Sequence, residues 1–169
     1  MSVGITRITG HAGAAIDLRA YLAGDLSEAE VPAIINNMSW SYGTGAGAVD
    51  VVYADTITIA DGADTTLEIN GGTLLDIFTR ALTLEAIKFV YIKNNSSDAT
   101  LEVLGTAVTA LDICKDKSDI ILVKPGGIFT WANPSAAGTD CSANFNLKLL
   151  HDGTGSSSMA VDVIIMGLD

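Results

Sequence analysis

The chain has 169 residues, of which 20 are acidic and nine basic, and a formal net charge of −11 at pH 7. Its length predicts one domain with a core of its own. Its acidity argues against direct nucleic-acid binding, which needs clustered Lys and Arg to neutralise phosphates. No apolar run approaches the roughly 18 residues of a membrane helix, and the first residues lack the pattern of a signal peptide. We therefore expect a soluble chain that is made in the cytoplasm.

Assembly is favoured by the composition. The mean hydropathy is +0.39 and only 17% of the residues are charged. Such a composition leaves weakly polar or apolar surface that another molecule can cover. The high net charge is consistent with solubility and with repulsion between copies.

Residues 1–48 differ from the rest and are predicted to form an N-terminal arm or extension. Apolar residues within 18–26 have partly helical spacing, and residues 27–30 (Ser-Glu-Ala-Glu) match a capping box. Pro32 would limit a helix there to a short one. Several glycines interrupt the helical pattern, so that an extended arm is the alternative.

Two aromatic residues of this segment, Trp40 and Tyr42, are candidate subunit contacts. An N-terminal segment with little packing of its own is suited to gripping a neighbouring subunit, and large aromatic residues often anchor such contacts. The aromatic residues of the later alternating segments are expected in the core, although a carbohydrate-binding platform is an alternative for them.

Residues 49–169 have the period of two that is typical of β-strands. Strands are predicted at residues 51–58, 67–69, 87–93, 100–104, 108–113, 120–123, 128–132, 144–150 and 159–166. Eight to ten short strands with hardly any helix predict an all-β domain, a β-sandwich or jelly roll.

Turn residues separate these strands. Residues 61–64 join the first pair, and the cluster 94–98 (Asn-Asn-Ser-Ser-Asp) predicts a hairpin of 87–93 with 100–104. Pro125-Gly126-Gly127 gives a strand, turn and strand between 120 and 131. The apolar connection 74–78 is a candidate for one helical turn.

Catalytic, cofactor and metal sites are not predicted. The glycine-rich segment 43–47 lacks the Lys-Ser or Lys-Thr of a phosphate loop, and both histidines, His11 and His151, lie among small residues in predicted solvated loops. Asp61, Asp64 and Glu68 do not have calcium-loop spacing. Cys114 and Cys141 are expected to be buried free thiols, although they could pair.

The chain resembles small structural proteins of tailed bacteriophages from about Gly43 to its end. The motifs that carry the resemblance are Gly43-Thr-Gly-Ala-Gly-Ala, Tyr53-Ala-Asp-Thr56, Leu67-Glu-Ile69, Lys88-Phe-Val-Tyr-Ile-Lys-Asn94, Leu101-Glu-Val-Leu-Gly105, Val123-Lys-Pro-Gly-Gly-Ile-Phe129 and Val161-Asp-Val-Ile-Ile-Met-Gly167. Each motif is weakly specific, and the resemblance rests on their order. Residues 1–42 do not clearly match.

The resemblance implies a non-enzymatic virion protein with a jelly-roll-like sandwich. It would be a head decoration or cement protein that binds the major capsid protein on the outer capsid surface. It would form a homo-oligomer, with a trimer favoured. No cofactor, nucleic acid or membrane is implied. The alternative is a structural module of a tail or head fibre. A cell-wall-degrading enzyme and a carbohydrate-binding module are further hypotheses.

Overall fold

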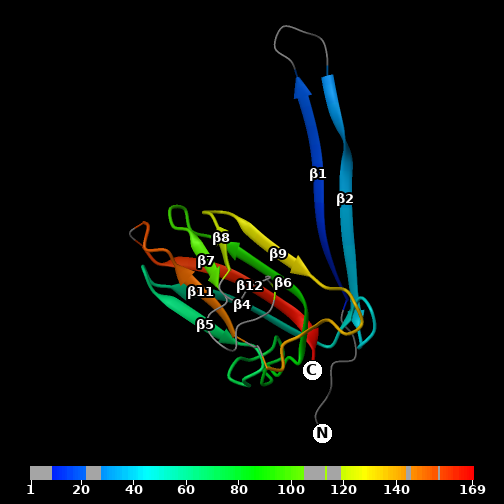
Figure 1. Cartoon of the computed structure of the whole chain (residues 1–169), viewed down its shortest axis with the longest axis vertical. Coiled ribbons are helices and arrows are strands. Elements are labelled where there is room, and N and C mark those ends of the chain that lie inside the picture. Colours follow the sequence, from blue (N-terminus) through cyan, green and yellow to red (C-terminus); the bar gives the residue numbers. More distant parts are fainter. Residues whose placement is uncertain (1–8, 22–27, 105–112, 114–118, 144–145, 156) are drawn as a thin grey trace.

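The computed structural model describes residues 9–21, 28–104, 113, 119–143, 146–155 and 157–169 (Figure 1). In these residues the chain forms β-strands and no helix. The prediction of an all-β fold is therefore confirmed. The strand predicted at 108–113 lies largely outside the described residues.

Two antiparallel sheets form a sandwich. In the first sheet, β4 (Val51–Ile59) pairs with β12 (Met159–Leu168), which pairs with β6 (Ala86–Asn94). The far edge of β6 is shared by β9 (Ile128–Ala132) and the short β10 (Thr139–Asp140). The second sheet has the order β5 (Asp64–Glu68), β11 (Asn146–His151), β7 (Leu101–Leu104) and β8 (Ile120–Val123).

The strand order is that of a jelly roll. If β10 is set aside and the eight sandwich strands are numbered 1 to 8 along the chain, the first sheet has the order 1-8-3-6 and the second the order 2-7-4-5. Two interleaved antiparallel four-stranded sheets of this kind define the jelly-roll architecture. The predicted β-sandwich is thus confirmed, with jelly-roll connections.

The predicted hairpin of residues 87–93 with 100–104 is wrong. β6 pairs with β12, β9 and β10, whereas β7 pairs with β11 and β8, so the turn at 94–98 crosses from one sheet to the other. The turns at 61–64 and at Pro125-Gly126-Gly127 likewise join strands of opposite sheets. Turn residues show where the chain reverses, but they do not show whether it returns to the same sheet.

The core lies between the two sheets. Along β12 every second residue is buried, beginning with Met159 and Val161. These side chains meet those of the second sheet, such as Leu101 and Leu149, in one continuous cluster. Strands with this alternation bury one face and leave the other exposed.

A long β-hairpin projects from the sandwich and forms the N-terminal arm. Its strands β1 (Thr9–Tyr21) and β2 (Glu28–Tyr42) are antiparallel, and the end of β2 pairs with the short β3 (Ala48–Val49) (Figure 1). The extended alternative is therefore correct for the described part of the arm. The helix starting near residue 27 is wrong, because cross-strand pairing with β1 outweighs the local capping signal.

Asn94 ties the two sheets together at the end of β6. Its side chain is buried, and its Nδ2 donates to the carbonyl oxygens of Ala99 at 2.8 Å and Val123 at 3.0 Å. Its Oδ1 accepts from the backbone N–H of Ser96 at 2.9 Å. One amide thus satisfies three backbone groups where the chain leaves the first sheet, as buried polar groups require.

We predict that Asn94→Ala lowers the free energy of unfolding by about 3 kcal/mol, because buried carbonyl groups lose their donor. Chemical denaturation measures this change. The matched control is Asn133→Ala: Asn133 lies partly exposed and makes bonds to Thr139 and Ser135. We expect the control to lose less than about 1 kcal/mol. Equal losses in the two variants would contradict the tying role of Asn94.

Candidate functional site

The polar residues considered from the sequence do not come together as a catalytic or metal site. Within the described residues, no group of three or more His, Cys, Asp or Glu could hold a metal ion. Asp64 forms an ion pair with Lys148 at 3.1 Å, and the carbonyl of Gly45 in the glycine-rich segment accepts a bond from Lys88. The described part of the chain also has no helix that could cross a membrane.

His151 is buried, in contrast to the solvated loop residue expected. Its Nε2 lies 3.0 Å from the carbonyl oxygen of Ser157, and its Nδ1 accepts from the N–H of Gly153 at 3.0 Å. Both ring nitrogens of His151 therefore have hydrogen-bond partners in the backbone of the segment that follows β11. His151 therefore stabilises the turn after β11. The other histidine, His11, lies in β1.

Cys141 is a buried free thiol, as predicted. Its Sγ donates to the carbonyl oxygen of Leu84 at 3.1 Å. Burial, together with the neighbouring charge of Asp140, raises the pKa of the Cys141 thiol to about 12. A thiol that stays protonated is a poor nucleophile, so this residue packs the core. Cys114 lies outside the described residues.

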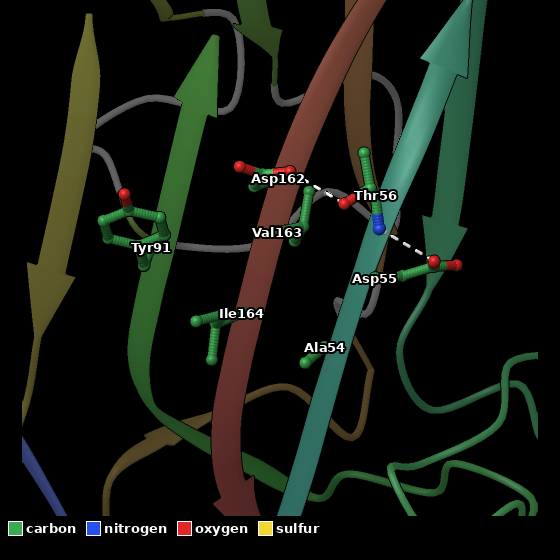
Figure 2. Close-up of a pocket in the computed structure, with 7 residues that line it drawn as sticks. All are labelled: Ala54, Asp55, Thr56, Tyr91, Asp162, Val163 and Ile164. Atoms are coloured by element: carbon green, nitrogen blue, oxygen red, sulfur yellow. Dashed lines mark hydrogen bonds between the residues drawn. The ribbon is translucent and has the colours of Figure 1, made fainter. Parts of the chain in front are cut away.

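An open depression of about 500 Å³ lies on the outer face of the first sheet (Figure 2). Thr56 on β4 donates to Asp162 on β12 at 2.8 Å. Hydrogen bonds from Asn95 and Thr56 lower the pKa of Asp162. This carboxylate is therefore held ionised by its neighbours, the opposite of what a general acid needs.

The arm is joined to the jelly roll through Lys88. The register of β6 with β12 shifts at this point, because Phe89 pairs with Met166 and Ile87 with Gly167, which leaves Lys88 as the extra residue of a β-bulge. Bulges redirect side chains. Here the fully buried Lys88 donates from Nζ to the carbonyl oxygens of Gly45 and Ala48, both at 2.8 Å.

The acidic residue Asp50 partly offsets the effect of burial on Lys88 at this junction. Burial lowers the pKa of Lys88, and the charge of Asp50 opposes that shift. Burial also raises the pKa of Asp50, while its Oδ1 accepts from the backbone N–H of Asp169 at 3.0 Å. Asp50, Lys88 and Asp169 thus form one partly buried ionic cluster. The cluster joins the segment after the arm to the bulge in β6 and to the end of β12.

Trp40 and Tyr42, the two predicted contact residues, have different surroundings. Trp40 is only 3% exposed and packs on Phe89 of β6, with ring centroids 6.0 Å apart. With Val49 these rings form a small second core on the outer face of the first sheet. Tyr42 is 46% exposed. Trp40 thus anchors the arm on its own jelly roll, and a contact of Tyr42 with a second subunit stays a prediction.

The loop between β5 and β6 exposes three large apolar side chains. Leu75, Ile77 and Phe78 are 55%, 48% and 50% exposed, and we call them the apolar knob. The predicted helical turn is wrong here, because the carboxylate of Asp76 organises a different turn. Its Oδ1 accepts from the N–H groups of Phe78 and Arg80, each at 2.8 Å.

The side chain of Arg80 completes this loop. Its Nε donates to Asp76 Oδ2 at 2.7 Å, and its guanidinium lies 5.7 Å from the centre of the Phe78 ring. Burial raises the pKa of Asp76, but the hydrogen bonds from Arg80 and from the backbone of Phe78, together with the charge of Arg80, lower it overall. Thr79 has a φ of +62°, which is uncommon for a β-branched residue. The sequence shows that residues 75–78 are largely apolar, but it does not show that three of these side chains are exposed.

No protein-family model matches the chain, and no curated protein matches it. The functional argument therefore rests on the geometry of the arm, the junction and the knob.

We predict that Lys88→Met loosens the arm base. Hydrogen bonds to charged groups contribute about 1.5–3 kcal/mol, and each 1.4 kcal/mol is a factor of ten. Hydrogen exchange of the Gly47 and Ala48 amides should therefore accelerate roughly 10- to 100-fold. The control is Lys93→Met on the same strand, which should leave both amides unchanged. Unchanged exchange in the Lys88 variant would show that the contact between the Trp40 and Phe89 rings is sufficient to hold the arm.

We predict that Cys141 makes stability fall at alkaline pH. Its thiol pKa is raised from 9.0 to about 12 in the folded chain, so the folded state keeps a proton that the unfolded state loses. The contribution of the Cys141 thiol to the free energy of unfolding is complete below pH 9 and is lost as the pH rises to 12. At 1.36 kcal/mol per pKa unit, the loss is about 4 kcal/mol. The difference in unfolding free energy between the wild type and Cys141→Ser should fall over this range. A difference independent of pH would refute the assignment.

Proposed function

We propose that this protein is a non-enzymatic structural component of a tailed-phage virion, a decoration or cement protein on the outer capsid surface. The observation that carries the proposal is the long arm, which is fixed to a jelly roll by Lys88 and Trp40. A compact domain with a firmly held extension can contact two neighbouring subunits at once. The order of the sequence motifs from about Gly43 to the end, which resembles phage structural proteins, led us to the same class; the resemblance rests on those motifs alone.

Bridging explains why such a contact stabilises a shell. When one chain binds two capsid subunits, the second contact forms at a high effective concentration, and dissociation requires both to break. Each contact can then bury a modest area and still stabilise the capsid, because many copies of the protein act together. The partner in this proposal is the major capsid protein, and the acidic surface is suited to a basic patch on it.

A fibre or collar module is the second candidate function. The arm that stands clear of the sandwich favours it, because a projecting ribbon can join the ribbons of other copies into a stalk (Figure 1). The two functions differ in copy number. Quantitative protein analysis of purified particles should give hundreds of copies for a decoration protein and at most a few dozen for a fibre. Absence from particles would overturn both.

We predict that removal of residues 1–37 weakens capsid binding at least tenfold while the jelly roll stays folded. This truncation keeps Met38 and Trp40, so the contact with Phe89 is preserved. Co-sedimentation with capsids that lack the protein measures binding, and thermal unfolding reports the fold. The control is Thr58→Ala, a substitution of an exposed side chain on β4. Undiminished binding of the truncated chain would exclude the arm as a capsid contact.

A further inference from the structure

The strand β4 forms one edge of the first sheet, and alternate residues direct their backbone groups away from the sheet. Among the described strands, β4 pairs with β12 alone. In an antiparallel pair, every second residue exchanges both hydrogen bonds with the partner strand, and the residues between them point their N–H and C=O groups to the other side. The carbonyl oxygen of Val52 accepts from the N–H of Ile77 at 3.0 Å, outside the sheet. By this alternation Ala54, Thr56 and Thr58 also direct their backbone groups to the edge.

The knob loop already occupies the first position of this edge. Its bond from Ile77 to Val52 shows that β4 accepts a backbone partner on this side. Further along β4, Ala54, Thr56 and Thr58 are exposed, and no other described strand lies beside them. The edge is thus open from Ala54 to Thr58, and it begins next to the half-exposed side chain of Ile77.

The carboxylate of Asp55 protects this edge against a second copy of the chain. Asp55 lies on the side of β4 that faces away from β12, and its Oδ1 accepts from the N–H of Thr56 at 2.8 Å (Figure 2). Charged side chains at sheet edges prevent like chains from pairing there. With a net charge of −11, a second copy would bring more negative charge to Asp55. The edge therefore discriminates against copies of this chain and favours a segment with positive charge.

The depression on the outer face connects this edge to a second carboxylate. Its lining includes the small side chains of Ala54 and Thr56 on β4 and that of Asp162 on β12 (Figure 2). Neighbouring strands lie about 4.8 Å apart, so two such spacings separate β12 from a strand added beside β4. A Lys or Arg side chain on the added strand can cross the two small residues and reach Asp162.

The charges around the depression suit a basic side chain. Hydrogen bonds from Asn95 and Thr56, together with the charge of Lys93, lower the pKa of Asp162, so its carboxylate is ionised. Lys93 lies opposite Asp162 on β6 and offsets one negative charge, which leaves the charge of Asp55 at the edge. The ring of Tyr91 also lines the depression, and an aromatic ring is a further favourable contact for a cation.

We propose that an extended segment of the capsid protein, carrying a Lys or Arg, adds to the first sheet as a strand beside β4. Its backbone bonds to Ala54 and Thr58, and its basic side chain pairs with Asp162. Strand addition takes its affinity from backbone hydrogen bonds and its specificity from alternate side chains. The inference rests on the proposed function and deepens it, because the β4 edge supplies a second capsid contact besides the arm.

Proline substitution at the edge tests the strand addition. Thr58→Pro removes an N–H that β12 does not use, so the jelly roll should stay folded, as thermal unfolding reports. Co-sedimentation with capsids that lack the protein should weaken at least tenfold, because the added strand loses a bond and meets the proline ring. The matched control is Thr58→Ala, which keeps the N–H and should bind as the wild type does. Ala54→Pro is a second variant with the same expected loss.

A change of charge tests the nature of the added segment. Asp162→Asn keeps an acceptor for Thr56 but removes the negative charge, so capsid binding should weaken at least several-fold and depend less on salt. The control is Glu85→Gln, which removes the same charge from an exposed residue just before β6 and should leave binding unchanged. Equal losses in the two variants would show that overall charge attracts the capsid, and would overturn the proposal.

Hydrogen exchange of the wild-type chain tests the contact without any substitution. On the capsid, the amides of Ala54 and Thr58 should exchange at least tenfold more slowly than in the free chain. Unchanged exchange of both amides, or full binding by a folded Thr58→Pro chain, would overturn the strand addition and leave the capsid function intact. A wild-type chain that does not bind capsids would overturn the proposed function and this partner with it.

Discussion

The buried ammonium group of Lys88 is the interaction on which the relation between arm and jelly roll depends. Its two bonds to the carbonyls of Gly45 and Ala48 join the segment after the arm to the centre of the first sheet. The bulge that directs Lys88 needs Gly167 opposite, since a Cβ there would lie 2.1 Å from the carbonyl oxygen of Ala86. A glycine in the last strand thus determines where the arm is fixed.

This junction divides the molecule into parts with different sources of stability. The jelly roll is stabilised by a continuous apolar core between its sheets. The arm has cross-strand pairing and, at its base, the small core of Trp40, Val49 and Phe89. Because that core lies on the outer face of the first sheet, the arm is fixed at its base.

The sequence predicted the strands well because each has an alternating apolar pattern. Residues 87–93 and 159–166 lie within β6 and β12 as expected. It did not predict the sheet partners, because residues such as Pro125 and Gly126 specify a local turn and not the strand that follows it. Lys88 gave no sign of burial, since a lysine in a strand is ordinarily solvated and the bulge depends on β12. Tertiary pairing decides all of these features.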